Sequence, residues 1–280
     1  GSIPDRNPGT DLFSAGDEHG LRQYIQALHK AADDADLEGV VIRLKDASIK
    51  GSQIEELGQA MKALRAKGKK VHVFAENYDS PDLRLGSFAD EVIVQSGGAV
   101  TLPGIHMDEM FLADAFKWVG ITPDFVQIGD YKGASEMMAN AKPSKAWDQN
   151  INQLLDSMYA ILREQLKAGR KLDDAKLDKA MEVAWLADEH DAIKAGLIDA
   201  AVDLPDLEQH LAKGYSVDEI EWVDDLLPAH KSELDTANPF ALLSMLTKAP
   251  DHSPKRDTIA VVHIDGAIID GDSAGGGLFG

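Results

Sequence analysis

The residues best suited to chemistry lie in the short segment 129–136, which reads Gly-Asp-Tyr-Lys-Gly-Ala-Ser-Glu. Two glycines bracket a lone lysine, Lys132, directly after the apolar run 124–128, which we predict to be a β-strand. A strand followed by a tight turn can aim one side chain into a site. A lysine acts as a general base only when its pKa is lowered, and burial lowers the pKa because a dry site disfavours the ammonium ion. Lys132 is therefore the candidate catalytic residue, although its spacing alone fits a solvated surface lysine better.

Other familiar catalytic patterns are absent from the sequence. There is no cysteine, which excludes thiolate nucleophiles and cysteine zinc sites. The segment 133–135, Gly-Ala-Ser, lacks the second glycine of a G-x-S-x-G elbow, and no serine is followed by lysine three residues later. The nine histidines are scattered without metal-ligand spacing, and neither glycine cluster, 97–98 or 275–277, is followed by G-K-[ST]. We therefore expect neither a metal nor a cofactor.

The composition narrows the class of protein further. The chain has 280 residues and is 44% hydrophobic, which is enough for a substantial core. Its formal net charge of -20 repels phosphate backbones, so nucleic acid is not an expected partner. No run of about 18 apolar residues is present, so the sequence predicts no membrane span.

The elements that would position Lys132 alternate between strands and helices. Short connections between parallel strands and helices define βαβ units, so the pattern predicts an α/β protein with a parallel sheet. Gly169 is expected just past the end of the longest helix. We predict strands at 40–44, 71–75, 91–94 and 124–128, and helices around 21–28, 54–64, 83–88, 111–119, 144–167, 177–183 and 188–195.

Three regions follow from this pattern. Residues 1–205 form the main α/β domain, and residues 206–257, which contain four prolines, form a helical connector. Residues 258–280 begin with another strong apolar strand, 258–264, and end soon after it. A buried strand needs further chain to cover it, so we interpret 258–280 as the incomplete start of a second α/β unit.

Four stretches of the chain, in order, resemble the signal-peptide peptidase or protease IV family of bacterial envelope serine peptidases, which has two tandem α/β halves. The strand 40–44 with Lys45-Asp46 is similar to the strand and loop of the family's first half. Residues 76–78, Glu-Asn-Tyr, with 85–90, Leu-Gly-Ser-Phe-Ala-Asp, are similar to its E-N-Y and L-A-S-F-A-[DN] segments. Residues 129–134 resemble its G-x-Y-K-[SG]-A segment, and 257–271 resemble the opening of its second half.

The resemblance implies a crotonase-like (Clp-protease-like) fold and a Ser–Lys dyad with Lys132 as the general base. The family's nucleophilic serine lies in the second half, beyond the end of this chain, so no serine here is expected to be the nucleophile. Lys50 stands where a first-half nucleophile would be, and the nearby Ser48 and Ser52 lack the matching glycine context. Ser135 is the only local rival.

The resemblance also implies partners and a location. The substrates would be signal-peptide remnants and other extended apolar peptides, and the second half of the same protein would carry the serine. Family members form homo-oligomers in the bacterial envelope, anchored to the membrane and facing the periplasm or exterior. Two alternatives remain open at this point: an acyl-CoA hydratase or isomerase with residues 97–99, Gly-Gly-Ala, as an oxyanion turn, and a non-catalytic assembly half.

Overall fold

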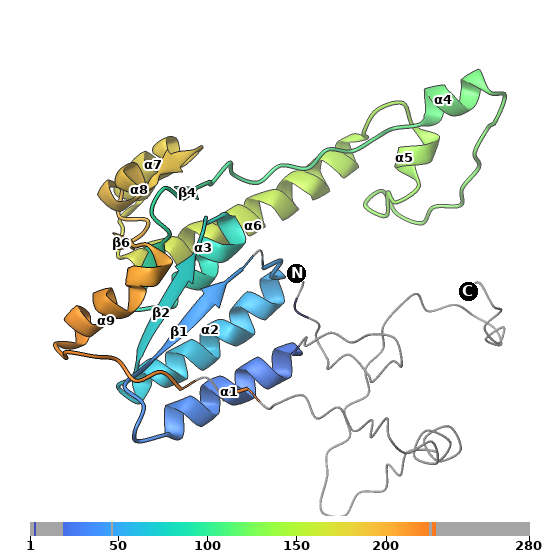
Figure 1. The fold of residues 1–280 in the computed structure, drawn as a ribbon. Coiled ribbons are helices and arrows are strands. Elements are labelled where there is room, and N and C mark those ends of the chain that lie inside the picture. Colours follow the sequence, from blue (N-terminus) through green and yellow to red (C-terminus); the bar gives the residue numbers. More distant parts are fainter. Residues whose placement is uncertain (1–2, 4–18, 46, 224–225, 228–280) are drawn as a thin grey trace, which may run out of the picture. The chain divides into compact units, whose positions relative to one another are not determined.

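The computed structural model describes residues 3, 19–45, 47–223 and 226–227 of the chain. All of them belong to the first of two compact units, Gly1–Ala229. The predicted second α/β start at 258–280 lies outside the described residues, and so does most of the predicted connector, 206–257. The first unit is built around one parallel sheet (Figure 1).

The sheet has four strands in the order β1-β2-β3-β6, and every neighbouring pair is parallel. A separate antiparallel pair joins β4 to β5. This arrangement confirms the predicted α/β class and the three main predicted strands. The strands are β1 Gly39–Leu44, β2 Lys70–Ala75, β3 Glu91–Val94, β4 Ala99–Val100, β5 Ala187–Asp188 and β6 Ala200–Ala201.

Helices connect the strands and cover the sheet. Figure 1 shows α1 and α2 side by side, and the two helices pack against each other. The helices are α1 Leu21–Asp33, α2 Gly51–Ala66, α3 Ser80–Gly86, α4 Ala113–Trp118, α5 Glu136–Ala139, α6 Lys145–Arg170, α7 Asp174–Val183, α8 Glu189–Lys194 and α9 Leu207–Tyr215, with a short 3-10 turn, η1 Leu204–Asp206, before α9.

The two faces of the sheet carry different cores because side chains alternate along a strand. Val71, Val73 and Ala75 of β2 face the main core, which they share with α1, α2, α3 and α8. Phe74, between them, faces the opposite side, where it packs with Ile93 and with the residues of α9. Helix α9 therefore belongs to the sheet domain, although it starts within the region 206–257 that we predicted to be a connector.

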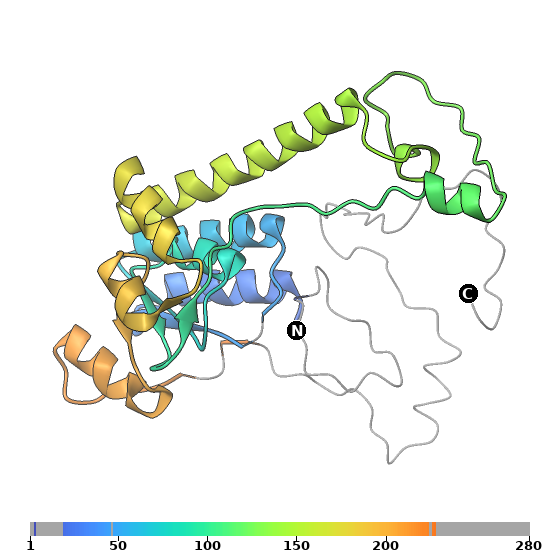
Figure 2. The same cartoon turned by 90° about the horizontal axis from the view of Figure 1, so that it is seen from above.

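Helix α6 is longer than predicted and only its second half is buried. Its buried residues are Leu162 and Leu166, whereas Leu154 and Met158 nearer its start are exposed. Gly169 was expected beyond the helix end but lies inside the helix. A larger residue does not fit there, because a Cβ would come within 2.1 Å of the Ser87 carbonyl oxygen. The helix ends at Arg170, and the next residue, Lys171, has a left-handed backbone conformation. Figure 2 shows α6 running from the sheet domain toward α4 and α5.

Candidate active site

Lys132 lies in a turn between residues 121–128, which have no regular secondary structure, and the short helix α5. The Lys132 N–H donates to the Gly129 carbonyl oxygen at 3.2 Å, and Gly129 has a positive φ of 86°. That conformation strongly favours glycine, so the sequence signal at this turn is confirmed. Beside Lys132, the Tyr131 hydroxyl donates to Gln149 of α6 at 2.8 Å. The turn is thus tied to the long helix.

The Lys132 side chain itself is exposed and is not sheltered by the described residues. Within those residues its amine has no hydrogen bond or ion pair, and no serine is brought to it. The sequence argument required a dry environment for the amine, and this part of the chain does not provide one. The assignment of Lys132 as a catalytic residue therefore stays a prediction.

The predicted strand 124–128 is not a strand in the structure. The segment has no regular secondary structure, and none of the backbone groups of residues 122–128 has a hydrogen bond to another described residue. Its apolar side chains are also uncovered, since Val126 is 98% exposed and Ile128 is 84% exposed. A β-strand exists only when it is paired, so the wrong prediction reflects a missing neighbour and not an unsuitable sequence.

A buried carboxylate holds the chain just after Lys132. Glu136 accepts hydrogen bonds from the Ser144 N–H at 2.9 Å, the Ser144 hydroxyl at 2.8 Å and the Asn140 side-chain amide at 3.2 Å. The Ser144 hydroxyl in turn accepts from the Trp147 N–H at 3.1 Å and caps α6. Sequence analysis gave Glu136 no role, although it lies only four residues after Lys132.

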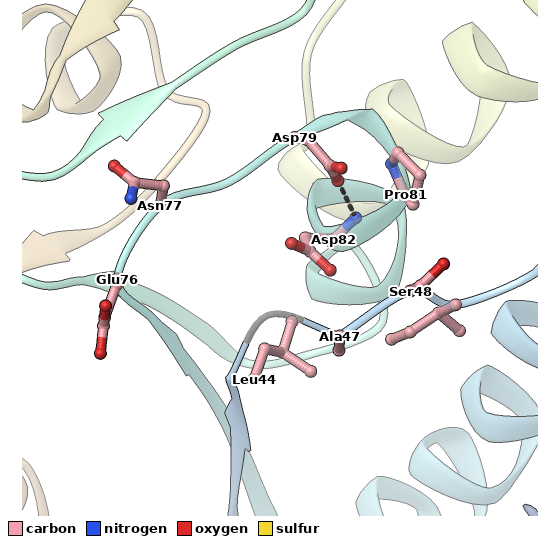
Figure 3. Close-up of a pocket in the computed structure, with 9 residues that line it drawn as sticks. Leu44, Ala47, Ser48, Glu76, Asn77, Asp79, Pro81 and Asp82 are labelled. Carbon is pink, nitrogen blue, oxygen red and sulfur yellow. Dashed lines mark hydrogen bonds between the residues drawn. The ribbon is translucent and has the colours of Figure 1, made fainter. Parts of the chain in front are cut away.

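A polar pocket lies where β1 and β2 end, at the carboxyl edge of the parallel sheet (Figure 3). Its volume is about 350 Å³, and ligands of open α/β sheets commonly bind at this edge. Lys132 is not among its lining residues. The pocket is lined by Leu44, Ala47, Ser48, Ile49, Glu76, Asn77, Asp79, Pro81 and Asp82.

Asp82 is the most perturbed acid in this pocket. Burial raises the pKa of its carboxyl from 3.8 to about 7, and the nearby negative charge of Asp79 adds to the rise. One of its oxygens, Oδ1, is buried without a hydrogen-bond partner among the described residues. Asp79 also caps α3, because its side chain accepts a hydrogen bond from the Asp82 N–H at 3.0 Å (Figure 3).

The Glu-Asn-Tyr motif at 76–78, directly after β2, has mainly structural contacts. The hydroxyl of the buried Tyr78 lies 2.9 Å from the Val73 carbonyl oxygen and 3.0 Å from that of Ile93, so it links β2 to β3. Asn77 accepts a hydrogen bond from the Ala99 N–H at 2.9 Å. Glu76 and Asn77 both line the pocket, and Glu76 is the acidic residue of the two.

The serines that could rival an external nucleophile lie apart from one another. Ser48 lines the pocket, Ser52 is exposed in the first turn of α2, and Ser135 precedes α5 without capping it. Lys50 precedes α2, and its N–H donates to the Gln53 side chain at 3.0 Å. Within the described residues, the Lys132 amine has no hydrogen bond to Ser48, Ser52 or Ser135.

The parallel sheet, its covering helices and the pocket at its carboxyl edge define an α/β protein of the class whose sites form where strands end. The described residues contain no group of three or more His, Asp or Glu side chains arranged to hold a metal ion. Across the same residues, no helix has the length and apolar character needed to cross a membrane.

Comparison with known proteins places the chain within that class. A family model described as peptidase family S49 matches residues 63–218, which is more than half of the chain and includes the turn at Lys132. The chain belongs to this family, and its resemblance to the signal-peptide peptidase or protease IV family is thereby confirmed.

Curated relatives carry the same kind of name. Protease 4 of Haemophilus influenzae is 28% identical over 89% of this chain, and Protease 4 of Salmonella typhi is 24% identical over 97%. The chloroplastic serine protease SPPA of Arabidopsis thaliana is 24% identical over 56% of the chain. The chain spans 40% of the Haemophilus protein, 44% of the Salmonella protein and 23% of the Arabidopsis protein.

Solved structures show more distant likeness. The match to AtuE of Pseudomonas aeruginosa covers 70% of this chain and 64% of the AtuE chain, with a TM-score of 0.41 and 13% identity. The match to an enoyl-CoA hydratase/isomerase family protein from Silicibacter pomeroyi covers 69% of this chain and 68% of that protein's chain, with a TM-score of 0.40 and 13% identity. At TM-scores near 0.4, neither likeness carries an argument about this chain.

Proposed function

We propose that this chain is the part of a serine endopeptidase that supplies the general base of a Ser–Lys dyad, Lys132. The observation that carries the proposal is the match to peptidase family S49, which includes the Gly129–Lys132 turn in its sequence context. The serine would come from polypeptide outside the described residues, in the second half of the same protein. The Lys132 amine, when neutral, would accept the serine proton as the serine attacks the peptide carbonyl, and backbone N–H groups would hold the oxyanion.

The exposure of Lys132 agrees with a dyad whose lysine and serine come from two different parts of the protein. A lysine in water remains an ammonium ion and cannot act as a base near neutral pH. The apolar side chains and unpaired backbone of residues 122–128 lie directly before the turn, so a partner that covered them would also remove water near the lysine. Docking of the serine-bearing half would then both complete the dyad and activate its base.

The proposed substrates are remnants of signal peptides and other extended apolar peptides, bound as an added strand. We also infer a bacterial envelope location, with a membrane anchor supplied by a segment other than the described helices, and assembly into a homo-oligomer. The exposed apolar residues around the Lys132 turn support such assembly, because large uncovered apolar patches are typical of interaction surfaces.

The hydratase or isomerase alternative needs the Gly97-Gly98 turn to offer free N–H groups to an oxyanion. The Gly98 N–H instead donates to the Gln95 carbonyl oxygen at 2.8 Å, and Gly97 has a positive φ of 82°. The segment is therefore a tight turn whose Gly98 N–H is already used. No observation favours this alternative.

The dyad is tested with the full-length protein and an extended apolar peptide substrate. Lys132→Ala and Lys132→Arg should both abolish turnover, because an arginine keeps the charge but cannot lose its proton. Lys117→Ala, at an exposed lysine of α4, is the matched control and should retain wild-type turnover. A serine-reactive phosphonate should label the full-length protein but not residues 1–280 alone. Wild-type turnover by Lys132→Ala removes the dyad assignment, and phosphonate labelling of neither protein favours the non-catalytic assembly half.

A further inference from the structure

The carboxylate of Glu136 is an unusual group to find buried. Its residue is only 6% exposed, and no cationic side chain pairs with it in the described part of the chain. Burying a charge is costly unless hydrogen bonds replace the lost water. Here both carboxylate oxygens are used, and two of the three donors belong to Ser144, the residue that caps α6. The positive end of this long helix dipole also favours a negative charge at that place.

These contacts join the chain after Lys132 to a long, regular helix. Gly133 is buried against the same group, since a Cβ there would lie 2.9 Å from Glu136 Oε1 and 2.9 Å from the Trp147 ring. Trp147 itself packs edge-on against Phe111, with ring centroids 5.9 Å apart. On the other side of Lys132, Tyr131 bonds to Gln149. The two neighbours of Lys132 are therefore both fixed to the first turns of α6.

We propose that Glu136 is a positioning residue for the peptidase reaction: it fixes the direction of the Lys132 amine by anchoring residues 133–144 to the start of α6. This inference rests on the proposed function of Lys132. An exposed lysine has many rotamers, so a fixed backbone on both sides is what limits where its amine can go. Glu136 neither touches the substrate nor exchanges a proton with it. Its effect is carried entirely through the turn.

The inference is tested by steady-state kinetics of the full-length protein with Glu136→Ala and Glu136→Gln. Loss of the anchor misplaces the amine, and a displacement of about 1 Å can cost roughly 10²-fold in rate, so Glu136→Ala should lower kcat by about that factor. KM should change little, because the substrate does not contact Glu136. Glu136→Gln keeps one acceptor oxygen, but its NH2 group is a donor and cannot accept a hydrogen bond as the second carboxylate oxygen does. It should therefore recover part of kcat. Its kcat and KM decide the question if Glu136→Ala does not fold.

Asp173→Ala is the matched control. Asp173 caps α7 by accepting from the Lys176 N–H at 2.8 Å, and within the described residues it has no hydrogen bond or ion pair with the Lys132 turn. Its loss should weaken a helix end and leave kcat at the wild-type value. The inference is overturned if both Glu136 variants keep wild-type kcat, or if Asp173→Ala loses as much kcat as Glu136→Ala. Wild-type turnover by Lys132→Ala would instead overturn the proposed function and this inference together, so the two failures are distinguishable.

Discussion

Asp82 should make the stability of the sheet domain depend on pH in a direction opposite to that of most carboxylates. Burial, together with the charge of Asp79, raises the pKa of Asp82 from 3.8 to about 7 in the folded protein. The folded state therefore keeps a proton that the unfolded state has lost between these two values. The contribution of Asp82 to stability is complete below the unfolded pKa and is lost as the pH rises through the folded pKa.

The size of the effect follows from the distance between the two pKa values. A difference of about 3 corresponds to roughly 4 kcal/mol for a group shielded from water. Asp82 is only partly buried, and screening by water reduces the expected contribution to about 1–2 kcal/mol. Asp82→Asn cannot ionise, so it should raise the free energy of unfolding by that amount at about pH 8 and change it little at about pH 4.

The assay is urea denaturation of both proteins across this pH range, followed by far-UV circular dichroism. Asp79→Asn is the matched control: it removes the neighbouring charge while its side-chain oxygen can still accept from the Asp82 N–H. It should make the pH dependence shallower without abolishing it, because burial is the larger cause of the raised pKa. The reasoning is refuted if the stability difference between Asp82→Asn and wild type is the same at both ends of the range.

Two further pairs of substitutions test how α6 is attached to the core. Leu166→Ala, at a fully buried position, should lower the free energy of unfolding by about 2–5 kcal/mol. Leu154→Ala, in the exposed half of α6, should change it by less than about 0.5 kcal/mol. Equal losses for the two variants in urea denaturation would contradict the half-buried helix. Arg170→Ala should lower the free energy of unfolding by about 2 kcal/mol or more, because the guanidinium binds both Asp199 carboxylate oxygens at 2.8 Å and 2.7 Å. Arg170→Lys should recover only part of this loss. A wild-type unfolding midpoint for either variant would exclude a stabilising role for the Arg170–Asp199 pair.

Strands whose partners lie close in the sequence were predictable from local pattern alone. β1, β2 and β3 are apolar runs separated by single helices, and each finds its neighbour within about one βαβ unit. Turn signals were equally local, as Gly129 shows with its positive φ. The end of α6 was misplaced because Gly169 was interpreted as a helix stop. Its real constraint is the close approach of Ser87, which a sequence pattern does not reveal.

The candidate site was predictable as a segment but not as a three-dimensional arrangement. The motif around Lys132 makes this residue a candidate, but a local motif does not show which parts of the chain surround its amine. The Glu136 anchor was missed because a single glutamate carries no periodic signal. Only the contacts with Asn140 and Ser144 reveal that it is buried and bonded.

Residues 122–128 connect the error in the strand prediction to the exposure of Lys132. β-branched and aromatic residues favour strands, and this segment contains Phe125, Val126 and Ile128. What it lacks among the described residues is the neighbouring backbone that a strand requires from elsewhere. The same neighbour would cover Val126 and Ile128 and exclude water from the turn that follows. The missing neighbour accounts for the unpaired segment, and under the proposed function the serine-bearing half would supply that neighbour and shelter the Lys132 turn.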